Sequence, residues 1–314
     1  MGKVLVTEQY LSDIADQIRE KLKTDVQYTP AQMADAISLM QGDRLPERLA
    51  CTLSGVFGDE TTTMLGDYAL AGCTGITSVI FSAMTSIGTS ALRACTGIKS
   101  VSMPLLTTVG SSAFYGCTGL TDVDLPLAAT LGTYAFYGCT GLVNLSLPAA
   151  TTFNNYAFQN CTKLKKLVIP KATSLNYTSM FIDDTSLEEV DCGGRALGRL
   201  GATLFSGCTK LKRVNATFTS TYTSSFINCK ALNGDGIDLS KCTSIAATTF
   251  SGCSSLTDLY LTYNGTTSLA NTSAFTGTPI ASKTGTIHVP ASRLATYKAA
   301  ARWSTYASIM VGDL

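Results

Sequence analysis

The residues with the clearest chemical potential in this sequence are one histidine and two pairs of acidic residues. His288 is the only histidine in the chain, so a Ser/His/Asp or Cys/His catalytic site would have to use it. Two carboxylates stand two residues apart at Asp122 and Asp124 and again at Glu189 and Asp191, a spacing that places both on one face of a strand. Such a pair could act in glycan hydrolysis, but a strand surface lacks the cleft that perturbs carboxylate pKa values. We therefore expect none of these residues to be catalytic.

Cysteines form the second chemically notable set, because five of the eleven in the chain are evenly spaced. The five, which follow one another every 22 residues, are Cys73, Cys95, Cys117, Cys139 and Cys161. Equivalent positions of stacked strands lie about 4.7–4.9 Å apart, beyond the mean Cβ separation of about 3.8 Å that a disulfide favours. We predict reduced, buried thiols that act as small apolar side chains. Cys51, Cys192 and Cys242 lie outside this row and are the ones left to pair elsewhere. No C-x-x-C pair or Cys/His cluster indicates a metal, and no cofactor is expected.

The even spacing belongs to a longer repeat that must position all of these side chains. Residues 106–126 read LTTVGSSAFYGCTGLTDVDLP, and residues 128–148 read AATLGTYAFYGCTGLVNLSLP. A fixed period of this length indicates a solenoid of stacked repeats. Within one repeat, residues 122–125 alternate polar and apolar side chains as a strand does, and residues 111–117 are predicted to form a single helical or 3₁₀ turn. One such unit cannot cover its own apolar face, so neighbouring units must supply the burial.

Ten units can be followed by two apolar columns. The first holds Leu70, Leu92, Phe114, Phe136, Phe158, Phe181, Phe205, Phe226, Phe250 and Phe275. The second continues the evenly spaced cysteines through Asp184, Cys208, Cys229, Cys253 and Thr278, so Asp184 is a departure from the pattern.

The recurring pattern A-F-x-x-C-x-x-L-x-x-V-x-L-P, which covers about residues 48–290, resembles the BspA-like bacterial leucine-rich repeats. The resemblance implies a right-handed leucine-rich-repeat superhelix with one parallel β-sheet, short helical turns on the opposite side and helical caps at both ends. It also implies a role in adhesion or binding, and it brings no catalytic residues with it.

Three segments are expected along the chain. Residues 1–44 contain two amphipathic patterns, at 7–22 and 29–40, and form either an N-terminal helical cap or a docking and oligomerisation segment. This segment is similar to short pieces that precede such repeats in gut-bacterial and prophage tail-associated proteins. Residues 45–290 form the solenoid, with a first, irregular strand at 49–53 and a mobile or solvated rim loop at 192–202. Residues 291–314 form a C-terminal capping helix that Trp303 packs onto the last repeat.

Composition limits the partners of the protein. Charged residues make up 14% of the chain and the formal net charge is +1, which suggests neither nucleic acid nor an anionic membrane as a partner. No stretch approaches the length of a membrane span, and the first residues do not form a secretory signal. A surface rich in small uncharged polar residues suits uncharged partners, glycans included. A cell surface, the extracellular space or a phage particle is the favoured location.

The outward strand positions are the predicted partner-binding face, because they vary freely while the inward residues maintain the fold. The residues chosen on it are Asp122, Asp124, Asn144, Lys166, Glu189, Asp191, Arg213, Asn215, Asp258 and Tyr260. Lys166, Glu189 and Arg213 alternate in sign, and cross-strand pairing explains this without a ligand. The resulting hypothesis is a non-catalytic binding or adhesion module for a protein or glycan on a cell surface. Alternatives are a phage-tail or prophage receptor-binding component that oligomerises through residues 1–40, and, more distantly, a glycan hydrolase.

Overall fold

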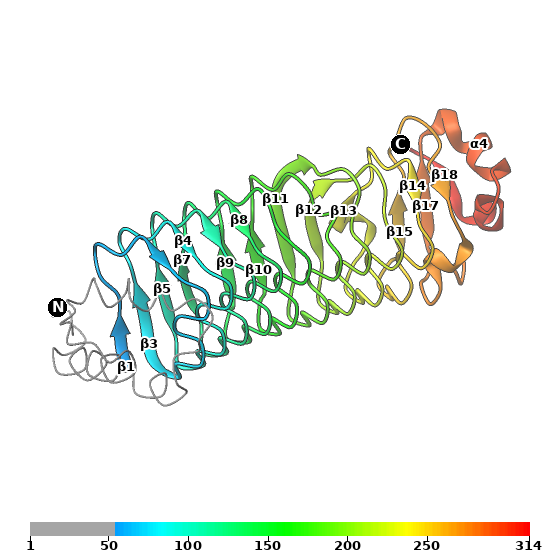
Figure 1. Ribbon diagram of the computed structural model, residues 1–314. Helices are drawn as coiled ribbons and strands as arrows, with labels where there is room; N and C mark the ends of the chain where they lie inside the picture. The colour runs from blue at the N-terminus through cyan, green and yellow to red at the C-terminus, as the bar shows by residue number, and fades with distance from the viewer. Residues whose placement is uncertain (1–53) are drawn as a thin grey trace, which may run out of the picture. The chain divides into compact units, whose positions relative to one another are not determined.

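The structure is a computed structural model that describes residues 54–314 (Figure 1). It divides into two compact units between Leu142 and Val143. The helical segment predicted at 1–44, the irregular strand at 49–53 and Cys51 lie outside the described residues. Each unit is a parallel β-solenoid, in which one turn of the chain, here called a coil, stacks its strands on those of the next coil. The predicted fold class, a repeat solenoid with parallel strands, is confirmed.

Two narrow parallel sheets run through the unit before Val143. The sheet with the longer strands has the order β1-β3-β5-β7, and the sheet of two-residue strands has the order β2-β4-β6-β8. The strands are β1 (Ser54–Phe57), β2 (Met64–Leu65), β3 (Gly75–Ile80), β4 (Ser86–Ile87), β5 (Ser100–Ser102), β6 (Thr108–Val109), β7 (Asp122–Asp124) and β8 (Thr130–Leu131). The prediction of one sheet is therefore corrected: each regular coil contributes a second, two-residue strand. A single buried residue per coil, such as Ile87 or Val109, holds this second ladder in place.

The segment that follows the second ladder is a run of turns rather than a helical turn. Its N–H groups alternate between two acceptors. The N–H of Leu92 donates to the carbonyl of Ala113 in the next coil (2.9 Å), whereas the N–H of Arg93 donates back to Ser90 (3.1 Å). Ser90 and Ala94 have φ of 57° and 58°, and residues in this left-handed region cannot continue a right-handed helix. The predicted helical turn is wrong because half of the backbone donors of this segment serve the neighbouring coil.

The unit from Val143 onward repeats this design with larger departures from regularity. Its sheets have the orders β13-β12-β11-β10-β9, β14-β16 and β15-β17-β18, and every pairing within them is parallel. The strands are β9 (Asn144–Ser146), β10 (Lys166–Val168), β11 (Glu189–Ala196), β12 (Arg213–Thr217), β13 (Ile237–Asp238), β14 (Ser244–Ile245), β15 (Asp258–Tyr260), β16 (Ser268–Leu269), β17 (Thr286–Val289) and β18 (Met310–Gly312). The helical segments are η1 (Gly234–Gly236), η2 (Thr272–Phe275), η3 (Ala291–Arg293), α4 (Leu294–Ala299) and η4 (Trp303–Ile309).

Both predicted columns form the core of each unit. In the first unit the rings of Phe114 and Phe136 stack with centroids 4.9 Å apart. In the second unit the stack runs from Phe158 to Phe275 with centroid separations of 5.1–5.9 Å. Full burial of each of these rings contributes roughly 1.5–3 kcal/mol before conformational entropy is subtracted. Stacking of coil on coil therefore supplies the stability that one coil lacks.

The cysteine column is buried and reduced, as predicted. The ten cysteines in the described part of the chain are free and buried. Several thiols donate to a carbonyl of the preceding coil, as Cys95 does to Leu70 at 2.9 Å and Cys208 does to Phe181 at 2.9 Å. Cys192 and Cys242 belong to this buried set and form no disulfide; burial raises their pKa to about 12 and about 11 respectively. The thiol thus has a donor role in addition to filling space.

The end of the chain differs from the single capping helix predicted at 291–314. The α-helix α4 has six residues, and the chain then returns through η4 to form β18 beside β17 (Figure 1). Arg302 has a left-handed φ of 66° and donates to the carbonyl of Leu269 (2.9 Å), while the indole N–H of Trp303 donates to that of Thr267 (2.7 Å). These two bonds hold the chain against an earlier coil and prevent a continuous helix.

Candidate functional site

The outward strand positions of the first unit end in two carboxylates. Asp122 and Asp124 lie on β7, opposite Ser100 and Ser102 of β5, as the repeat predicted. Ser102 donates its hydroxyl to Asp124 (2.9 Å). Both carboxylates are exposed on the strand. The arrangement suits solvated charge or contact with a partner.

In the second unit the outward residues form two rows across four strands. Asn144, Lys166, Glu189 and Arg213 lie opposite one another in that order, and the register is parallel throughout. Lys166 pairs with Glu189 at 2.9 Å, and this bond, with the charge of Glu189, raises the pKa of Lys166. Cross-strand pairing therefore explains part of the alternating charge, as predicted. Arg213, the next residue in the row, forms no ion pair within residues 54–314.

The second outward row is held together by Asp191. Its carboxylate accepts hydrogen bonds from the N–H of Gly193 (2.9 Å) and from the side-chain amide of Asn215 (2.7 Å). The bond from Gly193 is the largest cause of a lowered pKa for Asp191, and the bond from Asn215 adds to it. Asp191 thus stays ionised and fixes the orientation of Asn215.

The last two predicted residues, Asp258 and Tyr260, lie on β15 in a different sheet, where both contact a residue of the same chain. His288 on β17 contacts Asp258 through Nε2 (3.1 Å) and Asp313 through Nδ1 (2.9 Å), and its ring stacks on Tyr260 with centroids 4.5 Å apart. Hydrogen bonds from Thr257 and then from His288 lower the pKa of Asp258. Burial lowers the pKa of His288, but the hydrogen bonds to Asp313 and Asp258 outweigh it and raise the pKa overall.

This histidine cluster has the character of a structural clamp. Both ring nitrogens of His288 face carboxylates, so neither is left to deprotonate a nucleophile. The cysteines of the described region are buried. Nothing in this geometry performs the general-base role that a catalytic histidine requires.

A hollow lies where the strands of the second unit lose their regular register. The pairing of β11 with β12 shifts between Asp191 and Arg195, and that of β12 with β13 shifts between Val214 and Thr217. Bulges of this kind occur next to functional sites, where they redirect side chains. The open hollow has a volume of about 170 Å³. Its lining residues are Gly194, Arg213, Val214, Asn215, Ala216, Thr217, Asp235, Gly236, Ile237 and Asp238.

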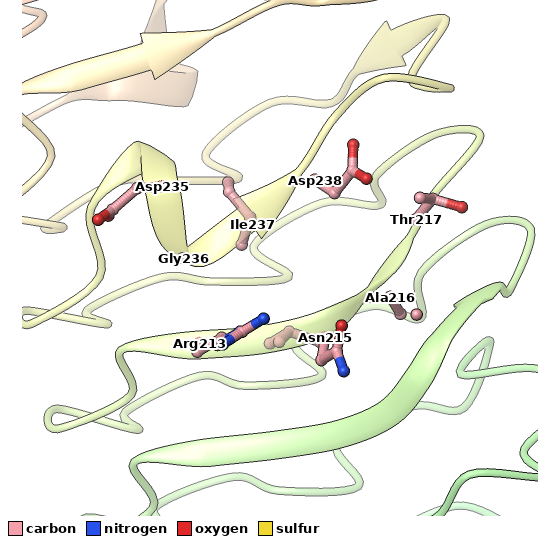
Figure 2. Close-up of a pocket in the computed structure, with 10 residues that line it drawn as sticks. Arg213, Asn215, Ala216, Thr217, Asp235, Gly236, Ile237 and Asp238 are labelled. Carbon is pink, nitrogen blue, oxygen red and sulfur yellow. The ribbon is translucent and has the colours of Figure 1, made fainter.

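Figure 2 shows the hollow, with Arg213, Asn215 and Thr217 along β12 and with Asp235 and Asp238 on the adjacent η1 and β13. Arg213 and Asn215 were predicted from the outward rows. Asp235 and Asp238 were missed, because they belong to a coil whose strand is shortened to two residues. The sequence signal that could have found Asp235 is the Gly-Asp-Gly triplet at 234–236, which interrupts the strand position of that coil.

The segment at 192–202, predicted as a mobile or solvated loop, is part of the sheet. Arg195 and Ala196 pair with Ala216 and Thr217. Further along the segment Leu197 and Leu200, with relative exposures of 2% and 0%, enter the core. The prediction failed because it weighed the glycines and arginines but not these two buried leucines.

Within residues 54–314, no three or more His, Cys, Asp or Glu side chains are placed to hold a metal ion. In the same range, no helix has the length and apolar character needed to cross a membrane.

Comparison with known proteins identifies the repeat. The family model for the BspA type leucine-rich repeat region matches in six copies over residues 50–130, 107–233 and 194–291. No curated protein matches the chain.

Solved structures of leucine-rich repeat proteins are similar at low sequence identity. A T. pallidum leucine-rich repeat protein is 20% identical, with a TM-score of 0.43, over 56% of this chain and 77% of that one. A leucine-rich repeat protein from Bacteroides ovatus is 19% identical, with a TM-score of 0.35, over 82% of this chain and 83% of that one. A leucine rich cell surface protein from Faecalibacterium prausnitzii is 22% identical, with a TM-score of 0.40, over 78% of this chain and 76% of that one.

Proposed function

Since this chain belongs to the BspA-type leucine-rich repeat family, we propose that it is a non-catalytic recognition module that binds a macromolecule through the outward side chains of its strands. The observation that carries the proposal is the contrast between the two faces of each strand. Inward positions repeat one apolar pattern and are buried, whereas the outward rows of the second unit present Asn144, Lys166, Glu189 and Arg213 in register. A rigid row of differing polar side chains is what selective contact requires, and the fold places no constraint on their identity.

The chemistry of the ionisable groups supports binding over turnover. Asp184 is the carboxyl whose pKa burial raises well above its ordinary value, but its side chain is fully buried and no substrate can reach it. The surface carboxylates Asp191 and Asp258 have lowered pKa values and so hold no proton to donate at neutral pH. We further propose that the partner is a protein or glycan of a cell surface, as the family resemblance implies.

The test uses the intact chain, labelled and applied to arrays of extracellular proteins and of glycans. A face variant carries Lys166→Ala, Arg213→Ala and Asn215→Ala. A matched control carries Lys210→Ala and Lys230→Ala, which remove exposed positive charges from the turn side of two coils in the same unit.

The expected result is binding that the face variant loses and the control keeps. Equal binding by the unmodified chain, the face variant and the control would refute the strand-face proposal. Loss in both variants would refute it as well, because the effect would then follow net charge rather than position.

A further inference from the structure

The hollow on β12 and β13 combines fixed polar groups in a way that points to a ligand class. We propose that Arg213, Asn215, Asp235 and Asp238 form a subsite for one neutral saccharide residue of a glycan. This inference rests on the proposed recognition function and names what one part of the binding face recognises.

The backbone on the η1 side of the hollow is rigidly placed. Asp235 is carried by η1 between Gly234 and Gly236. A Cβ atom at Gly234 would lie 2.0 Å from the carbonyl oxygen of Asp258, and one at Gly236 would lie 1.8 Å from that of Lys212. Only glycine permits this close backbone approach to the coils on either side. The backbone that carries Asp235 is therefore held at a fixed place between the neighbouring coils.

Asn215 is fixed from the other side of the hollow. Its amide nitrogen donates to Asp191, which is itself anchored by the N–H of Gly193. The amide oxygen of Asn215 then lies toward Gly194, 3.8 Å from where a Cβ of that residue would stand. Gly193 and Gly194 have φ of 66° and 70°, and the turn they make is the bulge that opens the hollow. The amide oxygen of Asn215 is thus already oriented before binding, so binding costs no conformational entropy at this side chain.

Opposite charges share the hollow but do not neutralise each other. Within residues 54–314, neither Arg213 nor Asp235 forms an ion pair, although both line the same hollow. Asp238 uses one carboxylate oxygen to accept from the N–H of Ser240 (2.8 Å), which leaves the second oxygen for a ligand. A guanidinium offers donors only and a carboxylate offers acceptors only. A ligand whose groups both donate and accept can satisfy all of them.

Hydroxyl groups have this dual character, and a neutral saccharide presents several in a small volume. An anionic ligand would be attracted by Arg213 but repelled by Asp235 and Asp238. A cationic ligand would be attracted by the two aspartates but repelled by Arg213. An apolar anchor of a protein partner has no place here. The apolar lining residues Val214, Ala216 and Ile237 are buried, with exposures of 2%, 2% and 6%.

The size of the hollow restricts the ligand to a single residue. Its volume of about 170 Å³ is below the range of roughly 300–1,000 Å³ that is usual for a drug-sized ligand. One sugar ring would lie in the hollow while the rest of the glycan extends along the strand rows. Binding of an isolated ring is therefore expected to be weak, near a dissociation constant of about 1 mM, with gains from longer glycans.

The experiment measures binding of methyl glycosides to the intact chain by saturation-transfer NMR and titration. The probe panel contains methyl glycosides of neutral hexoses and of N-acetylhexosamines, with an anionic sialoside and an acidic peptide as comparison ligands. The variants are Arg213→Ala, Asp235→Asn and Asp238→Asn, all at exposed positions, with circular dichroism to verify folding. The matched controls are Lys210→Ala and Asp183→Asn, which change exposed charges on the turn side.

The expected result is saturable binding of at least one neutral glycoside, weakened roughly tenfold or more by each of the three variants, which is the size expected when a hydrogen bond to a charged group is lost. The controls should leave it unchanged. The saccharide inference is overturned if no neutral glycoside binds, or if the variants bind it as well as the unmodified chain. Binding of the acidic peptide or the sialoside alone, lost in Arg213→Ala, would also overturn it, yet would leave the wider proposal of strand-face recognition standing.

Discussion

Asp184 offers the sharpest test of how the cysteine column stabilises the second unit. It occupies a column position that is cysteine in the coils on either side, its side chain is fully buried, and neither carboxyl oxygen has a hydrogen-bond partner within residues 54–314. Cys208, Cys229 and Cys253, which continue the column, each donate a thiol hydrogen to a carbonyl of the preceding coil at 2.9–3.1 Å. By the same spacing the carbonyl that faces position 184 is that of Phe158. We therefore predict that Asp184→Cys stabilises the protein.

The magnitude follows from the cost of an unsatisfied buried polar group. That cost is about 1–3 kcal/mol, so Asp184→Cys should raise the free energy of unfolding by about this amount at neutral pH. For a unit of this size each kcal/mol shifts Tm by roughly 2–4 °C. Asp184→Asn should gain less, because the amide is neutral but remains buried without a matched partner.

The stabilisation by Asp184→Cys should also depend on pH. Burial raises the pKa of Asp184 well above its ordinary value in the folded state, so the folded chain holds its proton more tightly than the unfolded chain does. The stability that goes with this proton is complete below the unfolded pKa of about 3.9 and falls as pH rises toward the folded value. The advantage of Asp184→Cys should therefore be smallest at pH 4, where the variant replaces an uncharged but unpartnered carboxyl, and should grow toward pH 8.

The assay is urea unfolding followed by the fluorescence of Trp303, which is buried in the same unit. Asp183→Asn is the matched control, because it changes an aspartate at the adjacent, exposed position. The reasoning is refuted if Asp184→Cys is less stable than the unmodified chain at pH 8. An advantage that is equal at pH 4 and pH 8 would also refute it, since ionisation would then have no part in the cost.

Three other expectations follow from the same structure. The aspartate partners of His288 raise its pKa against the effect of burial, so the clamp stabilises fully below the unfolded pKa and is lost as pH rises through the folded one. The protection factors of the β18 amides, taken relative to the intrinsic exchange rate at each pH, should fall over that range, and His288→Gln should abolish the fall. The described cysteines should resist maleimide labelling in the native protein and react after unfolding, so labelling of any except Cys51 without unfolding would contradict the buried column. Gly236→Ala should destabilise by about 1–3 kcal/mol, because its Cβ would overlap the carbonyl of Lys212, and thermal unfolding measures this.

The repeat and its two columns could be predicted from the sequence because one physical requirement recurs at a constant spacing. A side chain that must be buried in every coil, such as Phe181 or Phe205, leaves the same mark in every copy. The outward rows follow from the same period, which is why Lys166 and Glu189 were correctly placed opposite each other. What could not be predicted was which carbonyl groups accept the hydrogen bonds of the backbone N–H groups. A short segment such as 111–117 contains the same residues whether its N–H groups bond within the chain or to the next coil.

The candidate site was predicted only in part, and for a related reason. Arg213 and Asn215 stand at regular positions of the outward rows, so the period reveals them. Asp235 stands in a coil where η1 replaces most of a strand. Which residues face it across the hollow depends on register shifts, and the repeat period does not predict these shifts. Asp258 and Tyr260 were placed on the right strand, but their partner His288 lies 30 residues from Asp258 in the sequence.

Departures from a periodic pattern have different meanings on the two faces of a coil. An inward departure such as Asp184 must fit between fixed neighbours in the adjacent coils. It therefore destabilises the core, and a partner cannot reach it. An outward departure has no neighbour to displace. Residues 192–194, which have no partner in β12, therefore form the bulge; pairing with β12 resumes at Arg195, and Leu197 and Leu200 lie in the core beyond it. The hollow arises at this place because a solenoid can accommodate added length only on its surface, and the irregular coils of the second unit are accordingly where selective binding should be sought.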